Sequence, residues 1–260
     1  MLEIKTALIT GASGGIGLEF AKLFAADGYN LILIARSKEK LEAIATELYK
    51  KHKTATTIIA KDLSNPLAPR EVFKELQEKN CKVSVLINNA GFGDQTFFAE
   101  ADLKKTLRMI QLNITTLTHL TRLFLPEMIK RKSGKILNVA STAAYLPGPY
   151  MAVYYASKAY VLSFSQALSS ELASTGVTAT VLCPGPTETG FKDTANLGNS
   201  NLFKRNLMNA ETVAKLGYNA LIKEKPTIVT GFSNTLMTFI TRFLPRQITA
   251  ETAKKLQKPN

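Results

Sequence analysis

A tyrosine and a lysine stand four residues apart in the run YYASK at residues 154–158, where a long helix is predicted over Ala152–Ser174. At this spacing the side chains of Tyr154 and Lys158 project from one helical face. A free tyrosine, with a pKa near ~10, is a poor acid–base catalyst at neutral pH, but a neighbouring ammonium favours the phenolate and lowers that pKa. The pair could therefore exchange a proton with a substrate, although the same spacing occurs on many helices by coincidence.

Two further polar residues could join this pair. Ser141 follows the predicted strand Lys135–Ala140, and sites in parallel sheets form at such carboxyl ends. Its hydroxyl would hold a substrate oxygen near the tyrosine, or it would cap a turn together with Thr142. Asn113 stands between two predicted helices, where it would carry a water-linked proton path to Lys158 or cap a helix.

A glycine-rich run, TGASGGIG, fills residues 10–17 between the predicted strand Thr6–Thr10 and the predicted helix Ile16–Asp27. Glycines in this position permit a tight turn and let the backbone approach a pyrophosphate at the positive end of the helix. The spacing is G-x-x-x-G-x-G, which differs from the general dinucleotide motif G-x-G-x-x-G. Because the run follows a strand and opens a helix, it predicts a nucleotide-binding loop.

The turn after the second predicted strand, Asn30–Ala35, bears on the choice of cofactor. Folds that take NAD place an acidic residue there to hold the ribose 2′-hydroxyl, whereas this turn reads Arg36-Ser37. An arginine can pair with a 2′-phosphate, so NADP(H) is predicted in preference to NAD(H). The alternative is that Arg36 is a solvated loop residue.

The elements that must position these residues alternate in type along the chain. Strands are predicted at Thr6–Thr10, Asn30–Ala35, Thr56–Ala60, Val83–Asn88, Lys135–Ala140, Val177–Cys183 and Thr227–Thr230. Helices are predicted at Ile16–Asp27, Lys38–Lys51, from near Pro66 to before Asn80, at Asp102–Gln111, Thr115–Lys130, Ala152–Ser174 and Glu211–Lys223. This alternation predicts an α/β fold over 1–260, a single-domain Rossmann-type doubly wound parallel sheet of about seven strands with helices on both faces.

Composition and charge narrow the class of protein. The 260 residues are 45% hydrophobic and 20% charged, which is typical of a globular enzyme. The net charge of +13 favours a lysine-rich surface over a nucleic-acid site, because no basic run is interleaved with aromatics; anionic membranes, acyl carriers or phosphorylated partners are the alternatives. Two cysteines and two separate histidines predict no metal site. With no signal-peptide organisation and no apolar stretch of ~20 residues, a soluble cytoplasmic protein is expected.

Taken in order up to about Thr230, the motifs resemble the short-chain dehydrogenase/reductase family, and the runs AYLPGP and RFLP are similar to a broad bacterial branch of NADP-dependent reductases. The resemblance implies cofactor contacts from Gly11, Ser13, Gly15, Ile16, Gly17, Arg36, Asp62, Leu63, Asn89, Ala90, Gly91, Tyr154, Lys158, Pro184, Thr187 and Thr189. It implies a catalytic set of Asn113, Ser141, Tyr154 and Lys158, in which the tyrosine protonates a carbonyl oxygen while the nicotinamide delivers hydride to carbon. A homodimer or homotetramer is also expected.

A function of a different class is a catalytically silent NADP-sensing protein on the same fold. Such proteins usually lack the tyrosine or the lysine, and this chain has both. The substrate of an enzyme would be a hydrophobic ketone or aldehyde, since apolar side chains gather in three segments expected to line the pocket. They are Phe92, Phe97, Phe98, Tyr145, Leu146 and Tyr150, with further residues after Thr189.

Two segments near the C-terminus are expected to act at the site's border. Residues 190–209, rich in Gly, Asn and Lys, are predicted to form a substrate lid. The C-terminal extension 235–260 mixes large apolar side chains with arginines and lysines. It would be an amphipathic segment that contacts a membrane or a neighbouring subunit, or a helix packed on its own domain.

Overall fold

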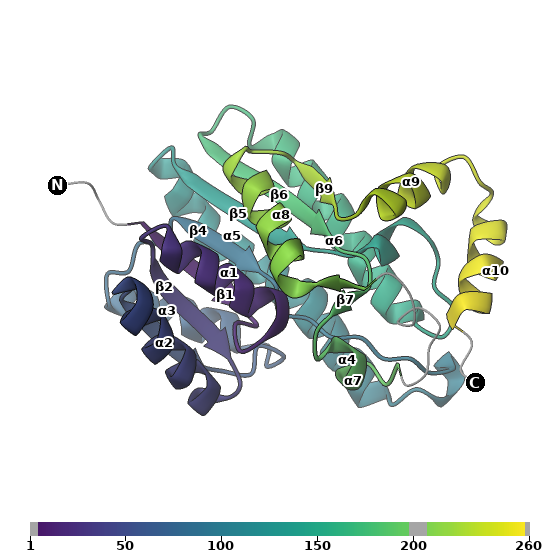
Figure 1. Cartoon of the computed structure of the whole chain (residues 1–260), viewed down its shortest axis with the longest axis horizontal. Helices are drawn as coiled ribbons and strands as arrows, with labels where there is room; N and C mark the ends of the chain where they lie inside the picture. The colour runs from purple at the N-terminus through teal and green to yellow at the C-terminus, as the bar shows by residue number, and fades with distance from the viewer. Residues whose placement is uncertain (1–4, 198–206, 258–260) are drawn as a thin grey trace.

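The structure is a computed structural model that describes residues 5–197 and 207–257. Its centre is a parallel sheet of seven strands in the order β3-β2-β1-β4-β5-β6-β9 (Figure 1). The strands are β1 (Thr6–Thr10), β2 (Asn30–Ala35), β3 (Thr56–Ala60), β4 (Val85–Asn88), β5 (Gly134–Val139), β6 (Val177–Cys183) and β9 (Thr227–Val229). The prediction of a Rossmann-type α/β fold is confirmed. The direction of winding reverses between β1 and β4, so a crevice opens beyond their carboxyl ends.

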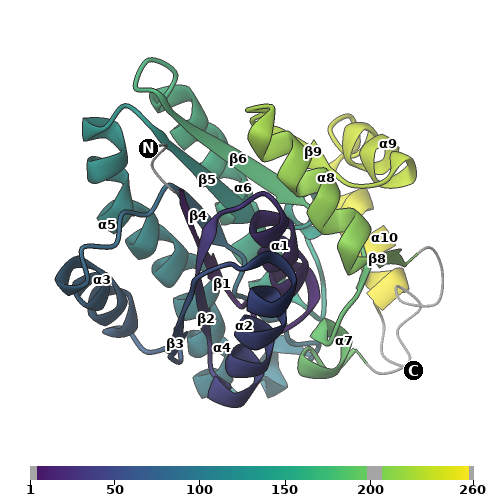
Figure 2. The same cartoon turned by 60° about the vertical axis from the view of Figure 1, so that its left-hand side comes forward.

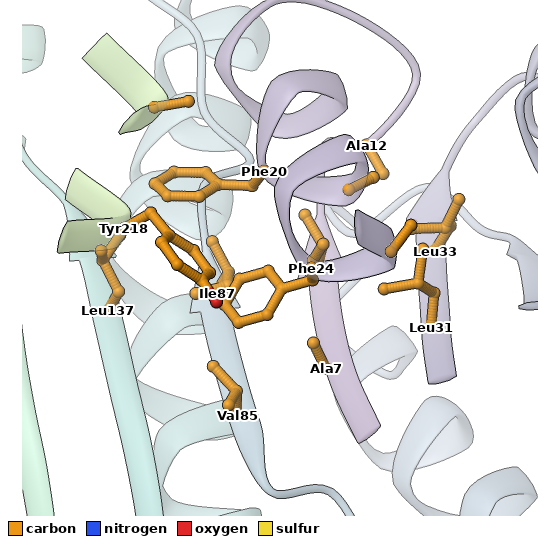
Figure 3. Close-up of a cluster of buried hydrophobic side chains, with 14 of the residues drawn as sticks. Ala7, Ala12, Phe20, Phe24, Leu31, Leu33, Val85, Ile87, Leu137 and Tyr218 are labelled. Carbon is orange, nitrogen blue, oxygen red and sulfur yellow. The ribbon is translucent and has the colours of Figure 1, made fainter. Parts of the chain in front are cut away.

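One face of the sheet packs on three helices, α1 (Gly15–Ala26), α2 (Lys38–His52) and α8 (Ala210–Ile222). Phe24 of α1 lies edge-on to Tyr218 of α8, with ring centroids 4.9 Å apart. Both rings rest over strand side chains such as Val85 and Ile87 (Figure 3). The glycine loop at the start of α1 is therefore carried on a helix whose position is fixed by aromatic packing.

The other face packs on α3 (Ala68–Glu78), α5 (Leu117–Lys130) and α6 (Ala152–Glu171), joined there by α4 (Leu103–Ile110). Two separate helices were expected around Asn113, and this expectation is wrong. A π-helical segment, η2 (Gln111–Thr116), joins α4 to α5 without a break. The Asn113 amide bonds to Phe92 and Ser157, and these distant contacts hold the wider turn, as is common for π-helical turns at functional sites.

The chain beyond β6 is less regular than the sequence suggested. A second, two-stranded sheet pairs β7 (Thr187–Glu188) with β8 (Met208–Asn209), and a short helix, α7 (Phe191–Thr194), follows β7. Two single-turn helices, η1 (Phe98–Glu100) and η3 (Thr142–Tyr145), lie in loops after β4 and β5.

The chain ends in two helices, α9 (Phe232–Ile240) and α10 (Arg246–Gln257). Figures 1 and 2 show both of them together at one end of the molecule, far from α2 and α3. No helix within the described residues is long and apolar enough to cross a membrane.

Replacing Phe24 with alanine should lower the free energy of unfolding by roughly 3–5 kcal/mol, because the side chain is fully buried between Tyr29 and Tyr218. Urea unfolding followed by circular dichroism measures the change. Leu67→Ala is the matched control, since Leu67 is 61% exposed and should change stability by less than about 0.5 kcal/mol. Equal losses in the two variants would contradict the packing described for α1.

Candidate active site

A cavity of about 940 Å³ opens at the carboxyl ends of the central strands. Each strand end contributes to it: Ser13 follows β1, Ala90 follows β4, Ser141 follows β5 and Pro184 follows β6. Segments far apart in sequence meet here because parallel strands end at a common edge. The expected site residues in its lining are Gly11, Ser13, Gly15, Ile16, Asn89, Ala90, Gly91, Ser141, Tyr154, Lys158, Pro184, Thr187 and Thr189.

The glycine loop is fastened to the end of β4 by side chains. The Thr10 hydroxyl accepts the backbone N–H groups of Asn89 (2.9 Å) and Ala90 (3.0 Å). The Asn89 amide in turn donates to the carbonyl oxygens of Thr10 and Gly11. A Cβ at Gly17 would collide with that Gly11 carbonyl, so glycine is required for α1 to approach the loop this closely.

The start of α1 fits a diphosphate. Its N-cap is Gly14, and no side chain caps the first N–H groups of the helix. Gly14 and Gly15 both line the cavity, and Gly15 has a φ of +54°, in the left-handed region that favours glycine. Uncapped N–H groups and the positive end of the helix dipole together attract an anion. The residues present therefore suit the diphosphate of a nicotinamide dinucleotide.

Two basic residues, Arg36 and Lys40, bear on the predicted preference for a 2′-phosphate, and of these Lys40 lines the cavity whereas Arg36 does not. Arg36, after β2, is exposed and makes no ion pair or side-chain hydrogen bond with any residue that the structure describes. Lys40, in the first turn of α2, lines the cavity beside Ser13. Lys40 was not predicted from the sequence, because only the approach of α2 to the glycine loop brings it to the cavity.

Asp62 and Leu63 follow β3 outside the cavity itself. Partial burial alone would raise the pKa of the Asp62 carboxyl, but hydrogen bonds from Ser64 and the charges of Arg108 and Arg36 hold that pKa below its ordinary value. The Arg108 guanidinium donates to Asp62 at 2.9 Å. Leu63 is buried, and its carbonyl oxygen accepts the Thr116 hydroxyl. These contacts fix an ionised carboxylate at the border of the groove.

Tyr154, Ser141 and Lys158 come together at the inner end of the cavity. Tyr154 is 9% exposed and Lys158 is 6% exposed. Ser141 accepts the backbone N–H of Ala143 (3.1 Å) and donates to the carbonyl oxygen of Pro184 (3.3 Å). Ser141 thus caps the single-turn helix η3, which agrees with the predicted alternative that it caps a turn. It also lies within hydrogen-bonding reach of the Tyr154 phenol.

Burial dominates the acid–base properties of this pair. It raises the pKa of Tyr154 to about 12, against the smaller effect of the Ser141 hydroxyl, and it lowers the pKa of Lys158 to about 8. The Lys158 Nζ donates to the Val139 carbonyl oxygen at 2.9 Å and lies 5.8 Å from the centroid of the Tyr154 ring. The expectation that Lys158 lowers the pKa of Tyr154 below its usual range is therefore wrong for this structure.

Asn113 lies behind the pair. Its Nδ2 donates to the Phe92 carbonyl (2.9 Å) and to the Ser157 hydroxyl (3.1 Å), while its Oδ1 accepts the Phe92 N–H (3.1 Å). A Cβ at Gly91 would lie 3.0 Å from the Asn113 side chain and 3.5 Å from the Lys158 Nζ, so all three residues meet at one point. Ser157 was not predicted as a site residue. Its hydroxyl accepts the Asn113 amide and donates to the Tyr154 backbone carbonyl, so it links η2 to α6.

The wall opposite the glycine loop is apolar, but it is not built as expected. Leu146 lines the cavity, whereas Phe97 and Phe98 are exposed on the surface, at 58% and 65%. Tyr145 turns its hydroxyl toward Cys183 instead. Apolar side chains that do line the cavity are Ala143, Leu146, Met151, Phe191, Leu197, Leu236, Met237, Ile240 and Leu244.

Part of the expected lid lies against this wall, and residues 198–206 of it fall outside the described residues. Phe191 packs on Tyr154 with ring centroids 5.3 Å apart. The Ala195 carbonyl accepts the N–H of Gln95 (2.9 Å), and the Asn196 amide donates to Asp94 (2.9 Å). Residues 191–197 thus cover Tyr154 from one side.

The C-terminal extension lines the cavity with one face. Met237 and Ala253 belong to the lining, and Thr249, also in the lining, is buried. At the end of α10 the Gln257 side chain bonds to the Tyr155 hydroxyl, and its carbonyl accepts the Gln95 amide at 2.6 Å. The alternative of a helix packed on its own domain holds for this face; the last expected residues, 258–260, lie outside the described residues.

Curated relatives resemble about two thirds of the chain. It is 41% identical over 176 residues to a very-long-chain 3-oxoacyl-CoA reductase of Phaeosphaeria nodorum, which is 66% of this chain and 51% of that protein. It is 35% identical over 182 residues to the inactive hydroxysteroid dehydrogenase-like protein 1 of Homo sapiens, covering 68% and 54%. The chain thus spans about half the length of these relatives.

Solved structures match nearly the whole chain. A short-chain dehydrogenase from Sphingobium yanoikuyae in complex with NADPH aligns with a TM-score of 0.83 at 27% identity, covering 94% of this chain and 97% of that one. A short chain dehydrogenase/reductase from Burkholderia phymatum in complex with NAD aligns with a TM-score of 0.82 at 26% identity, covering 92% and 94%. The family model for short chain dehydrogenase matches residues 5–199. The chain therefore belongs to the short-chain dehydrogenase/reductase family of oxidoreductases, which use a nicotinamide dinucleotide.

Proposed function

We propose that the protein is an NADP(H)-dependent carbonyl reductase that interconverts a hydrophobic ketone or aldehyde and its alcohol. The observation that carries the proposal is the buried pair of Tyr154 and Lys158, with the half-buried Ser141 beside it, in a cavity with an apolar wall. A bound nicotinamide supplies the hydride in this family's chemistry. The chain's own residues must hold the carbonyl group and give its oxygen a proton.

Tyr154 is the proton donor in this proposal. Because burial raises the pKa of its phenol to about 12, Tyr154 is protonated throughout the neutral range and can act as a general acid. Ser141 lies beside the phenol and would donate to the same substrate oxygen. As Tyr154 gives up its proton, the buried charge of Lys158 favours the phenolate that forms, because opposite charges interact strongly where water is excluded.

Asn113 would connect the pair to solvent. The π-helical turn at η2 leaves backbone groups outside the regular helical pattern, where they can bind water. Such a water, between Asn113 and Lys158, would return the proton that Tyr154 loses in each turnover. In this proposal Ser157 is a positioning residue, because it holds the Asn113 amide without facing the substrate.

The preference for NADP(H) rests on charge at the outer end of the groove. Arg36 and Lys40 make no ion pair with a residue of the described ranges, so both can bind a 2′-phosphate. The Asp62 carboxylate already accepts a hydrogen bond from Arg108. NADH would lack the phosphate that these two cations require.

The substrate class rests on the apolar wall and on a relative's name. A wall built by side chains such as Leu146, Met237 and Leu244 favours a long or bulky apolar group next to the carbonyl. A 3-oxoacyl thioester, the kind of compound named for the Phaeosphaeria nodorum reductase, has this chemistry. We propose that residues 191–197 act as the fixed part of a lid that shields the reacting groups from water.

The catalytically silent sensor is the second candidate. It is favoured by the relative named as inactive, and by the bond that directs Lys158 to Val139 and away from the phenol. A sensor would bind NADPH tightly, but no carbonyl compound would cause it to oxidise NADPH.

Tyr154→Phe should lower kcat for ketone reduction by roughly 10²- to 10⁴-fold, because it removes the general acid and leaves the ring in place. NADPH oxidation with a panel of apolar ketones and aldehydes measures the loss, and fluorescence titration checks that NADPH still binds. Tyr160→Phe, on the same helix, is the control and should keep its rate, since that hydroxyl contacts Thr118 far from the cavity. Absence of turnover by the wild type despite tight NADPH binding would favour the sensor.

The pH profile should report Lys158. Its pKa of about 8 predicts that kcat/KM for reduction is constant below about pH 8. Above that pH, kcat/KM should fall about tenfold per pH unit, because the ammonium loses its proton. Tyr154, with a pKa of about 12, stays protonated over this range and adds no limb. The residual activity of Lys158→Met should lack the fall, and a wild-type rate that rose steadily with pH would rule out this assignment.

Replacing Arg36 and Lys40 together by alanine should lower kcat/KM for NADPH by roughly 10- to 100-fold, because each charge-assisted bond contributes about 1.5–3 kcal/mol before solvent screening. kcat/KM for NADH should change less than about threefold, since it has no 2′-phosphate. Lys38→Ala is the matched control from the same turn, where Lys38 pairs with Glu42 at 3.7 Å. Equal losses with both cofactors would show that the two cations do not select the phosphate.

A further inference from the structure

The C-terminal arm, defined as residues 232–257, carries a cluster of exposed apolar side chains. Phe232 is 85% exposed and Phe243 is 73% exposed, and the rings of Phe239 and Phe243 pack edge-on with centroids 5.2 Å apart. The full cluster is Phe232, Leu236, Phe239, Ile240, Phe243, Leu244 and Ile248. Soluble proteins rarely leave so many large apolar groups together in water, so this face is expected to bind a partner.

The cluster is not needed to pack the arm on its own domain. The buried residues among those described in the arm are Thr238, Thr249, Ala253 and Gln257, and none of them belongs to the cluster. Phe239 and Phe243 do not line the cavity either. These rings therefore face outward at the end of the molecule where Figure 1 shows α9 and α10.

Basic residues border the cluster. Arg242 and Arg246 stand within it, and Lys254 and Lys255 follow on α10, against one acidic residue in the arm, Glu251. All four cations are exposed, and none forms an ion pair with a residue of the described parts of the chain. Aromatic and aliphatic side chains beside unpaired cations are what an anionic bilayer surface binds, through its acyl chains and its headgroups.

The cavity and the cluster share residues. Leu236, Ile240 and Leu244 line the cavity, and they are also 49%, 44% and 41% exposed. The apolar wall of the site is therefore continuous with the apolar outer face of the arm. A molecule passing between these side chains would move from one apolar surface to the other with little contact with water.

We propose that the arm docks on the surface of an anionic phospholipid bilayer, with Phe239 and Phe243 among the acyl chains and Arg242 and Arg246 at the headgroups. The shared wall then faces the bilayer. Direct access of a lipophilic carbonyl compound from the membrane to the site rests on the proposed function, whereas the docking itself does not.

A second copy of this chain fits the face less well. A twofold interface places the same patch on both partners, so the cations Arg242 and Arg246 of the two copies would come together. Within the arm Glu251 is the one residue that could compensate, and like charges across a dry interface are unfavourable. A negative lipid surface supplies the missing counter-charge.

Vesicle flotation with the full chain tests the proposal, without substrate. The wild type should bind vesicles of phosphatidylcholine with roughly one third phosphatidylserine, and bind those of phosphatidylcholine alone far less. Phe239→Ser with Phe243→Ser should lower the bound fraction of protein about tenfold or more. Arg242→Glu with Arg246→Glu should lower it on anionic vesicles to a similar degree.

Matched controls change the same groups elsewhere. Tyr49→Ser with Leu67→Ser removes two exposed apolar side chains, and Lys50→Glu with Lys51→Glu reverses two exposed charges on α2. Both should bind like the wild type. No binding by the wild type, or equal binding by the arm variants, would overturn the proposal. So would sedimentation showing an oligomer that the double serine variant dissociates, because the face would then lie between copies.

Turnover separates this proposal from the proposed function. Reduction of a water-soluble ketone in the absence of vesicles should proceed at the same rate in the Phe239→Ser, Phe243→Ser variant as in the wild type, since neither ring lines the cavity. If the protein binds vesicles but reduces no carbonyl compound, the membrane-docking proposal is supported and the proposed reductase function is rejected.

Discussion

The hydroxyl of Thr10 holds together the two chain segments that form the cofactor end of the site, the glycine loop after β1 and the segment after β4. Where the winding of the sheet reverses, the chain segments leaving β1 and β4 turn in opposite directions, and a crevice would open between them in any case. Thr10 bonds to two consecutive N–H groups after β4, and Asn89 returns two bonds to the glycine loop. These four hydrogen bonds join the two segments that border the crevice, and they fix the position of the uncapped start of α1 beside it.

Burial dominates the acid–base properties of Tyr154 and Lys158, and it shifts the two pKa values in opposite directions. It keeps the Tyr154 phenol neutral and makes the Lys158 ammonium easier to lose, since a low-dielectric surrounding disfavours charge on either group. The carbonyl oxygen of Val139 partly offsets this penalty by accepting the ammonium. The phenol is thus neutral at neutral pH, and in the proposed function the nearby ammonium stabilises the phenolate that forms when the phenol gives up its proton.

How much could be predicted from the sequence depends on how local each feature is. The strands Thr6–Thr10, Asn30–Ala35 and Val177–Cys183 were predicted to the residue, because an apolar run bounded by turns identifies a buried strand by itself. The residues brought to the cavity also followed from motif order. The π-helical turn at Asn113 could not be predicted, since Ser157, which holds it, is distant in sequence.

The substrate wall was the least predictable part, for a related reason. Phe97 and Phe98 are apolar and close in sequence to a site loop, yet which way such a loop turns is set by contacts such as Thr96 with Tyr150, not by composition. Lys40 was missed because lysines on the first turn of a surface helix are common, and only the approach of α2 to the glycine loop gives this one a position in the groove.

The C-terminal arm is packed differently from the helices that cover the sheet, because a helix that lines a cavity has fewer side chains packed against it than a helix that covers a core. On α9, Leu236, Met237 and Ile240 line the cavity, so these apolar side chains border an open space instead of a packed core. The apolar residues at 232, 236, 239, 240 and 243 recur with helical spacing and form one stripe, of which Leu236 and Ile240 line the cavity. The rest of the stripe, with Phe232, Phe239 and Phe243, is exposed. One continuous apolar stripe therefore forms part of the cavity wall and part of the outer surface, and the outer part is the surface for which we propose a bilayer as partner.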